Sequence, residues 1–457
     1  MSQTLHVVIL AAGQGKRMKS PLPKVLAPLA GGTLLDRVLD RAKALRPEAI
    51  HVVVGHQAET VKARYADVPD LHWVPQEQQL GTGHAVMMAL PTIPDGAQVL
   101  VLLGDMPLLE TETLSMLCDL AGNEVAILTA RVPDPAGYGR IVRAHDGSVQ
   151  AIVEHRDADA ATLLIDEVNS GLMAAPRERL ALWLDKLDQG NVQGEYYLTD
   201  VVSLARQYGV PVQALLAEDP NELLGANDRW QLATLERMFQ RRLAHGLCDA
   251  GATLADPARI DIRGDVSVEP GVFIDVNAVF EGYNRLGADV HIGPGCHLID
   301  CDLAPGTTVN AHCVLEGMRT TGACDIGPFA RLRPGTELAE GTRIGNFVET
   351  KNARLGQGSK ANHLSYVGDA EVGADVNIGA GTITCNYDGA NKHTTVIGDG
   401  AFIGSDSQLV APVTVGPGAT IGAGTTVTKD APDNELTVTR RRQMTIPGWK
   451  RPTKQES

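Results

Sequence analysis

A six-residue repeat of aliphatic side chains dominates the last two-fifths of the sequence. Isoleucine, leucine or valine recurs every six residues in several runs, and glycine often follows directly. The longest runs occupy Ile262, Val268 and Ile274; Leu286, Ile292 and Leu298; Ile326, Leu332, Leu338 and Ile344; and Ile397, Ile403, Leu409, Val415, Ile421 and Val427. A period of six fits neither the 3.6-residue period of a helix nor the two-residue alternation of a strand.

This period is typical of short strands and corners that wind into a triangular, left-handed parallel β-helix. Each hexad then forms one face of a prism, and its aliphatic side chain points inward onto the neighbouring coils. Residues 262–430 should make roughly nine coils, each rising by about the 4.8 Å spacing of strands in a sheet. A β-sandwich is the alternative, but its strands alternate with a period of two. Flat prism faces pack well around a threefold axis, so we expect a homotrimer.

Length, charge and cysteine content set further bounds. The 457 residues suffice for two or three domains. The net charge of −15 argues against nucleic-acid binding, so an anionic substrate must be met by local Arg and Lys. The seven scattered cysteines form no Cys-x-x-Cys pair, and we expect reduced core thiols in a cytoplasmic protein rather than disulfides or zinc. We expect neither a signal peptide nor a membrane span, because no suitable apolar run is present.

The chain divides into three parts. Residues 1–229 alternate apolar strands with helical stretches, which predicts a Rossmann-like α/β sheet. Residues 230–251 carry a linker helix, because one stripe at helical spacing holds Leu232, Leu235, Phe239, Leu243 and Leu247. Residues 252–457 contain the six-residue repeat and end in a basic tail.

A glycine-rich motif, LAAGQGKRM at residues 10–18, follows the first predicted strand. Glycine-rich turns let backbone amides approach phosphate groups closely. A dinucleotide fingerprint would need its third glycine where Met18 stands. The cations Arg17 and Lys24 instead suit a triphosphate whose charge grows on a leaving pyrophosphate. A Gly-x-Gly turn alone more often has only a structural role. The prediction of a nucleotide site therefore depends on the two cations.

The predicted strand at residues 99–103 ends in Gly104 and Asp105. The carboxyl ends of parallel strands are where open α/β sheets bind ligands, and a carboxylate there suits Mg²⁺ among phosphates. Capping of the following turn is the structural alternative for Asp105. Asn227, in the segment GAND, could reach the same metal.

The repeat is most disturbed between residues 355 and 396, where residues 384–396 form an insertion. Interruptions of a solenoid map to loops that often line binding faces. His363 lies in this region, and imidazole is a suitable base near neutral pH. A lone histidine in a repeat is more often a packing residue, and the later run at residues 440–442 is by itself more often a solvated basic tail.

Several segments together resemble known enzymes. The glycine-rich motif, QLGTGHA, LGD, GYGR, VEH, NSG and GEYYLTD resemble sugar-1-phosphate nucleotidyltransferases. With the repeat, residues 5–450 resemble bacterial bifunctional N-acetylglucosamine-1-phosphate uridyltransferases and glucosamine-1-phosphate N-acetyltransferases. The resemblance implies that the C-terminal domain acetylates glucosamine-1-phosphate with acetyl-CoA. The N-terminal domain then couples N-acetylglucosamine-1-phosphate to UTP and releases pyrophosphate. The product, UDP-N-acetylglucosamine, feeds peptidoglycan and lipopolysaccharide synthesis.

The same resemblance implies roles for residues of the N-terminal part. The nucleotide would contact Leu10, Ala11, Ala12, Gly13, Gln76, Gly81 and Thr82. Arg17 and Lys24 would be catalytic through the phosphates, and the strand end would contribute Leu103, Gly104 and Asp105. The acetylated sugar would contact Gly139, Glu154 and Asn169, while Mg²⁺ would bind Asp105 and Asn227. Leu103 stands where the family often has tyrosine, so a backbone contact survives there and a side-chain contact does not.

For the repeat domain, the resemblance implies that His363 is the catalytic base. The glucosamine-1-phosphate ligands would be Arg333, Lys351, Tyr366 and Asn377. Acetyl-CoA would lie against Ala380, Asn386, Tyr387, Ser405, Ala423 and Arg440.

Two alternative functions remain open at this point. The chain could be a nucleotidyltransferase whose β-helix serves only regulation or assembly, since a fold by itself does not fix a function. It could also be a trimeric scaffold for a protein partner, with a first domain that senses nucleotide. Release of CoA with glucosamine-1-phosphate argues against the first alternative, and release of pyrophosphate from UTP argues against the second.

Overall fold

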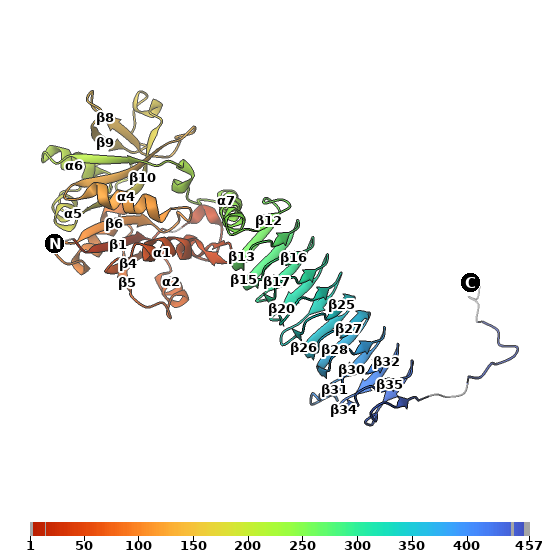
Figure 1. Ribbon diagram of the computed structural model, residues 1–457. Coiled ribbons are helices and arrows are strands. Elements are labelled where there is room, and N and C mark those ends of the chain that lie inside the picture. Colours follow the sequence, from red (N-terminus) through yellow and green to blue (C-terminus); the bar gives the residue numbers. More distant parts are fainter. Residues whose placement is uncertain (1–2, 14, 440–442, 452–457) are drawn as a thin grey trace, which may run out of the picture. The chain divides into compact units, whose positions relative to one another are not determined.

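The computed structural model describes residues 3–13, 15–439 and 443–451, which form two compact units (Figure 1). The units divide between Phe239 and Gln240, inside helix α7 (Arg229–Asp249). Within the described ranges, no helix is both long and apolar enough to cross a membrane.

The first unit is built on a nine-stranded sheet in the order β11-β7-β10-β6-β1-β4-β5, with β8 beside β10 and β9 beside β8. Its strands are β1 (Leu5–Leu10), β4 (Ala49–Val54), β5 (Leu71–Pro75), β6 (Gln98–Leu103), β7 (Val125–Arg131), β8 (Arg140–Arg143), β9 (Val149–Val153), β10 (Glu167–Pro176) and β11 (Val212–Leu216). A separate pair joins β2 (Pro28–Leu29) to β3 (Gly32–Thr33). Strand β10 runs antiparallel to β6 and β7, whereas β1 is parallel to both of its neighbours.

Helices cover both faces of this sheet. One face buries Val7 and Ile9 against α1 (Leu34–Ala44), α2 (Ala58–Arg64) and α4 (Thr111–Ala121). The other buries Val8 against α3 (Thr82–Ala89), α5 (Arg177–Leu184) and α6 (Asp200–Gln207). Successive residues of a strand point to opposite faces, so β1 is apolar along its whole length. Because Leu10 pairs with Leu103, the carboxyl ends of β1 and β6 lie side by side.

The second unit is a parallel β-helix with three faces. One face is an eleven-stranded sheet, formed by β12 (Thr253–Leu254), β14 (Phe273–Ile274), β16 (His291–Ile292), β19 (Thr308–Val309), β22 (Asp325–Ile326), β25 (Arg343–Asn346), β27 (Lys360–His363), β29 (Asn377–Ile378), β32 (Phe402–Ile403), β35 (Thr420–Ile421) and β37 (Leu436–Thr437). Within the described residues, all the strand pairs of this unit are parallel.

The remaining two faces belong to one fifteen-stranded sheet, because its longest strands run around a corner. Its strands are β13 (Ile260–Val268), β15 (Ala278–Leu286), β17 (His297–Ile299), β18 (Asp302–Leu303), β20 (Val314–Glu316), β21 (Arg319–Thr320), β23 (Arg331–Leu332), β24 (Glu337–Leu338), β26 (Glu349–Leu355), β28 (Tyr366–Val372), β30 (Ile383–Cys385), β31 (Thr395–Ile397), β33 (Gln408–Val410), β34 (Val413–Val415) and β36 (Thr426–Val427).

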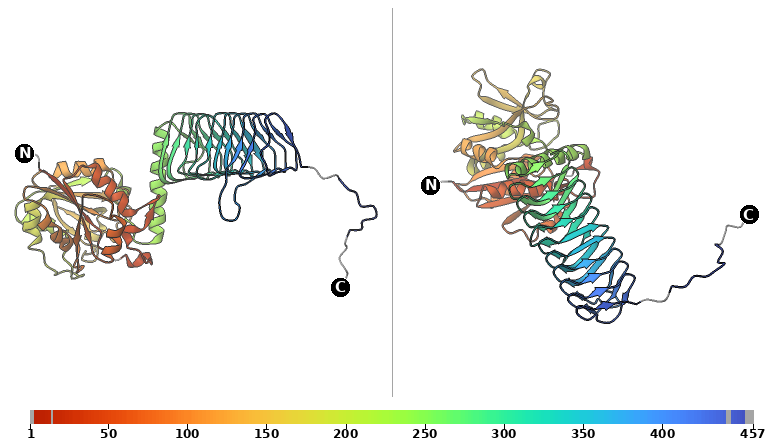
Figure 2. Two further views of the ribbon diagram at one scale, coloured as in Figure 1. Left: turned by 90° about the horizontal axis from the view of Figure 1, so that it is seen from below. Right: turned by 45° about the vertical axis from the view of Figure 1, so that its right-hand side comes forward.

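The register confirms the coil that the repeat predicts. His291 pairs with Thr308 and Thr308 with Asp325, so that one coil takes 17 residues there. Nine strands of the eleven-stranded face lie within residues 262–430, which matches the predicted nine coils, and a strand at each end adds one more. Among the described strand pairs of this face, the longest step runs from Asn377 to Phe402, because residues 386–394 leave the coil as a loop (Figure 2).

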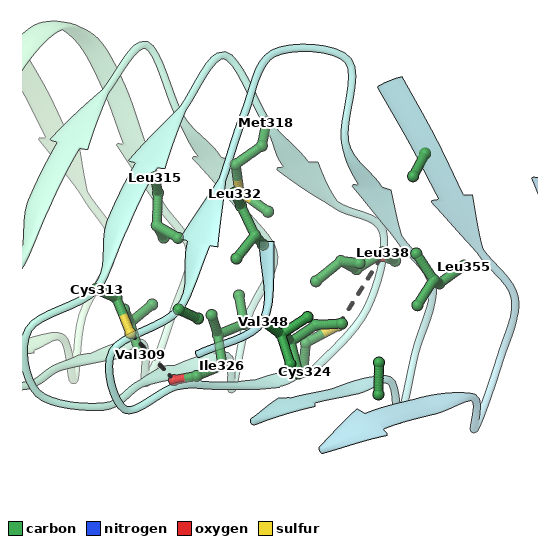
Figure 3. Packing of buried hydrophobic residues seen from close by; sticks show 14 of the residues in the cluster. Val309, Cys313, Leu315, Met318, Cys324, Ile326, Leu332, Leu338, Val348 and Leu355 are labelled. Carbon is green, nitrogen blue, oxygen red and sulfur yellow. Dashed lines mark hydrogen bonds between the residues drawn. The ribbon is translucent and has the colours of Figure 1, made fainter. Parts of the chain in front are cut away.

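The aliphatic repeat residues fill the interior of the β-helix. Leu332 and Leu338 point inward with Leu315 and Leu355 (Figure 3), and all four are buried. Of the repeat positions named above, only Val268 is partly exposed. All seven cysteines are free thiols, but the expectation that all lie in cores was wrong: Cys248 is exposed on α7, and Cys385 is half-buried. The last turns of α7 present polar residues to solvent around the buried stripe, so a thiol there can face outward.

Truncation of one inward side chain should destabilise the β-helix. Leu332→Ala leaves a cavity in a fully buried site, and we expect it to lower the free energy of unfolding by roughly 2–5 kcal/mol. Arg331→Ala, on the exposed position of the same strand, should change it by less than about 0.5 kcal/mol. Urea unfolding followed by circular dichroism measures both variants, and equal effects would contradict the inward packing.

Three histidines lie in a row across β1, β4 and β5 in the first unit. His6 Nδ1 is 3.1 Å from His51 Nε2, and the His51 ring stacks on His72 with 5.1 Å between centroids. Thr92 Oγ1 lies 2.9 Å from His51 Nδ1. Burial, assisted by the neighbouring His6 and His72, lowers the pKa of His51 to about 4. Burial also lowers the pKa of His6, although Glu48 opposes the effect.

The histidine row should make the first unit sensitive to acid. An unfolded histidine titrates near pH 6.5, so between about pH 6.5 and 4 the unfolded chain binds a proton that folded His51 does not. The contribution of neutral His51 to the free energy of unfolding is therefore fully present above about pH 6.5. It decreases as the pH falls through this window. We expect His51→Gln to reduce this pH dependence and His145→Gln, at an exposed site, to leave it unchanged. The measurement compares the free energy of unfolding at about pH 7.5 and 5 for the unmodified protein and the two variants. An equal change with pH in all three would contradict the role of His51.

Candidate functional sites

The glycine-rich motif begins at the end of β1 and ends with the short helix η1 (Lys16–Met18), and the short helix η2 (Lys24–Leu26) follows it. Gly15 has a φ of +57°, and a Cβ there would lie 2.7 Å from Cβ of Lys24. A side chain at Gly15 is therefore excluded both by its backbone conformation and by the approach of Lys24. Gln79 Nε2 donates to the carbonyl of Ala12 and holds the other side of the turn.

Lys24 connects the two residues that the sequence predicts as metal ligands. Its ammonium group forms an ion pair with Asp105 Oδ2 and donates a hydrogen bond to Asn227 Oδ1 at 3.0 Å. Two oxygen atoms from distant segments thus converge on one positive charge. A Cβ at Gly225 would lie 3.1 Å from Asp105 Oδ2, so glycine leaves space beside this carboxylate.

This donor set fits Mg²⁺, which prefers carboxylate and carbonyl oxygens. In the part of the chain that the structure describes, no group of three or more His, Cys, Asp or Glu residues could hold a metal. A cation held by Asp105 and Asn227 would therefore take its other ligands from phosphate oxygens and water.

A cleft of about 670 Å³ opens beside these residues. Arg17, Asp105 and Asn227 line one part of it, and Gly139, Glu154 and Asn169 line another. The structure therefore brings together predicted residues from both ends of the first unit's sequence. The cleft joins a cationic, oxygen-rich region to a region with amide and carboxyl groups.

The β8–β9 hairpin and β10 position the predicted sugar ligands. Asn169 N donates to Gly139 O at 2.9 Å, and Thr199 Oγ1 donates to Glu154 Oε1 at 3.1 Å. Burial raises the pKa of Glu154, Asp157 and Asp200 raise it further, and the Thr199 hydrogen bond opposes them. Glu154 is therefore a carboxyl group that holds its proton more readily than one in water.

A second cavity, of about 510 Å³, lies on the other side of the β1 end. Seven of the residues that the sequence predicts as substrate contacts line this cavity: Leu10, Ala12, Gly13, Gln76, Gly81, Thr82 and Leu103. Gln76 Nε2 donates to Gly81 O at 3.1 Å, and Gly81, with a φ of +112°, passes close to the backbone of Tyr196. Lys24, Ala11 and Gly104 line neither cavity; Ala11 N bonds to Val53 O and Gly104 N to Leu10 O.

His363 lies at the end of β27 on the outer surface of the β-helix. Its Nδ1 is 3.1 Å from Asn346 Oδ1, which belongs to the preceding coil. Because a carbonyl oxygen only accepts, this contact places the ring proton on Nδ1 and leaves Nε2 as the basic nitrogen. Asn346 is a residue that the sequence analysis missed, and its position one coil before His363 is the signal that identifies it.

A polar cluster surrounds Lys351 on the neighbouring face. Buried Asp369 accepts hydrogen bonds from Asn352 and Asn386, and Asn386 Nδ2 lies 3.4 Å from Tyr366 Oη. Burial opposes ionisation of Asp369, but these hydrogen bonds and nearby lysines lower its pKa. The predicted ligands Tyr366, Asn386 and Lys351 are therefore brought together, whereas Arg333 forms an ion pair with Glu349 at 3.0 Å.

Lys392 is a second residue that the sequence analysis missed. The adjacent ammonium group of Lys351 lowers the pKa of Lys392. Two lysine side chains that approach each other outside the core are typical of a site for a phosphate group. Lys392 lies inside the loop of residues 386–394, where the six-residue period gives no register.

The predicted acetyl-CoA residues stack on successive coils. Asp406 N donates to Ala380 O, and Gly424 N donates to Ser405 O, each at 2.8 Å. Ala380, Ser405 and Ala423 thus follow one corner of the β-helix. Tyr387 is 60% exposed on the loop. Arg440 lies outside the described residues.

Comparisons with known proteins identify both units. Residues 7–171 match the family model of the MobA-like NTP transferase domain, and residues 394–429 match the bacterial transferase hexapeptide (six repeats). A transferase model that covers part of the β-helix argues against a purely regulatory or scaffolding repeat.

Curated relatives match both units together. Bifunctional protein GlmU of Stenotrophomonas maltophilia is 58% identical over 99% of this chain and 100% of its own length. The proteins of that name from Alkalilimnicola ehrlichii and Xylella fastidiosa are 58% and 56% identical over 99% of this chain, and over 97% and 99% of their own lengths. The chain therefore belongs to the GlmU family of bifunctional enzymes, which unite a uridylyltransferase and a glucosamine-1-phosphate acetyltransferase in the synthesis of UDP-N-acetylglucosamine.

Proposed function

We propose that the cleft at the ends of β1 and β6 is the uridylyl-transfer site. The convergence of Lys24, Asp105 and Asn227 carries this proposal, because it places a cation and two oxygen ligands together at the edge where such sheets bind ligands. The uracil then occupies the cavity of Gln76 and Gly81. The acetylated sugar lies against Glu154 and Asn169.

The chemistry follows from charge and position. An oxygen of the sugar phosphate attacks the α-phosphorus of UTP in line, the bond to the bridging oxygen breaks, and pyrophosphate leaves. No general base is required, because the attacking oxygen is already an anion. Lys24 and Arg17 stabilise the negative charge on the phosphates. Asp105 and Asn227 would hold Mg²⁺, which neutralises further phosphate charge when bound.

We propose that His363 is the base of the acetyltransferase site. His363 Nε2 accepts a proton from the sugar amine as the amine nitrogen bonds to the thioester carbonyl, and CoA then leaves as its thiol. Asn346 keeps the ring in the required tautomer. Lys351, Lys392 and Arg333 bind the sugar phosphate, Tyr366 and Asn377 orient the sugar, and acetyl-CoA follows the corner formed by Ala380, Ser405 and Ala423.

A homotrimer fits this second site. Phe329 and Phe347 stack with 5.6 Å between centroids and are 50% and 57% exposed, and Leu364, beside His363, is 63% exposed. Apolar side chains exposed in a row next to a polar site indicate a surface that another chain covers. A neighbouring copy would exclude water from the thioester, and the free cysteines support a reducing, cytoplasmic location.

Substitution of one residue per site should separate the two activities. Asp105→Ala removes an oxygen ligand and should lower uridylyl transfer at least roughly 100-fold, while CoA release with glucosamine-1-phosphate stays near wild type. His363→Ala should give the opposite pattern. Pyrophosphate and CoA release measure the two half-reactions, and Asp119→Ala serves as an exposed control for the first. Loss of both activities in either variant, with intact secondary structure, would contradict separate sites.

Removal of the Lys392 charge should weaken phosphate binding. Lys392→Met should raise the KM for glucosamine-1-phosphate roughly tenfold, because one charge-assisted hydrogen bond is lost, with a smaller effect on kcat. Lys360→Met, at an exposed position of β27, should change neither value. The CoA-release assay distinguishes these outcomes, and an unchanged KM for the Lys392 variant would remove it from the site.

A further inference from the structure

A small, mostly apolar chamber lies between the two cavities of the first unit. It measures about 100 Å³, and its apolar walls are Leu10, Leu103, Leu172, Met173 and Leu198. The polar edge consists of Thr82, Glu154, Asn169 and Thr199. Since one water needs roughly 10–15 Å³, the chamber has space for several non-hydrogen atoms.

Leu103 belongs to the walls of this chamber and of both neighbouring cavities. Of the described residues that line the three hollows, Leu103 alone lines all of them. The chamber shares Glu154, Asn169 and Gly171 with the sugar side of the large cleft. A Cβ at Gly171 would lie 3.0 Å from Leu103 Cδ1, so the Leu103 side chain points toward β10 and forms the partition.

We propose that Leu103 determines acyl specificity in uridylyl transfer, and that the chamber beside it takes the N-acyl group of the sugar, including chains longer than acetyl. This inference rests on the proposed function, in which Glu154 and Asn169 hold the acetylated sugar. The amide of the acyl group meets these polar residues, and its carbon chain lies against Leu103, Leu198 and Met173. Burial of each added methylene against these apolar walls is favourable rather than costly.

The side chain at position 103 sets the size of the chamber. Leucine has four side-chain carbons, whereas a tyrosine at this position would bring a ring and a hydroxyl group into the same space. In a chamber of about 100 Å³, that change removes the space for longer acyl chains. Leu198 also lines the chamber, so a phenylalanine there should fill part of the same space.

The test compares N-acetyl-, N-propionyl- and N-butyrylglucosamine-1-phosphate as substrates with UTP, through kcat/KM for pyrophosphate release. For the unmodified enzyme, we expect kcat/KM with the butyryl substrate to lie within roughly tenfold of the value with the acetyl substrate. An apolar pocket that has space for extra methylene groups discriminates only weakly against them. Leu103→Tyr should lower the butyryl-to-acetyl ratio at least roughly tenfold. Leu198→Phe should do the same, and Leu103→Met, which preserves volume, should not.

The outcomes separate this inference from the function on which it rests. If the enzyme releases no pyrophosphate with N-acetylglucosamine-1-phosphate, the proposed site fails. If it uses that substrate but rejects the butyryl substrate more than roughly 100-fold, the chamber does not take the acyl group. The inference is also overturned if both chamber-filling variants leave the ratio unchanged. Pyrophosphate release with the acetyl substrate checks that the first unit of each variant is folded. If Leu103→Tyr fails this check, the ratio measured for Leu198→Phe decides the outcome.

Discussion

The parallel pairing of β1 with β6 determines where the first unit can perform chemistry. Leu10 and Leu103 end these strands side by side, and the chain beyond each strand must turn at the same edge of the sheet. The turn after β1 brings Lys24, and the turn after β6 brings Asp105. Neither carboxylate nor ammonium could remain so little exposed, at 21% and 14%, without the other. The ion pair is therefore both a structural contact and part of the proposed site.

The β-helix follows a different principle, because each coil depends mainly on its two neighbours. Inward aliphatic residues repeat the same contact along the axis, so the surface can vary without loss of the core. The loop of residues 386–394 leaves the coil between β30 and β31, and the register resumes from Asn377 to Phe402. His363 and Asn346 use the same regularity, because residues of adjacent coils are held at strand spacing.

Periodic features could be predicted from the sequence, and long-range contacts could not. The six-residue repeat identified the inward residues and the nine coils, because each position repeats one local rule. The glycine-rich motif and Asp105 were predicted to lie at a ligand-binding edge because each follows directly after a predicted strand. The hydrogen bond from Lys24 to Asn227 joins residues 203 positions apart, and no local pattern encodes it. Lys392 was missed because an insertion has no period. Leu103 was expected to contact the substrate only through its backbone, and the position of its side chain among the three hollows could not be predicted.

The ammonium of Lys24 also acts as an internal counter-ion for the predicted metal ligands. While it neutralises Asp105, the pocket offers little attraction to a stray divalent ion from solution. In the proposed uridylyl-transfer site, the phosphates of a nucleotide would attract Lys24, and Asp105 would then be available to a cation. Such an exchange of partners would link binding of the cation to binding of the nucleotide.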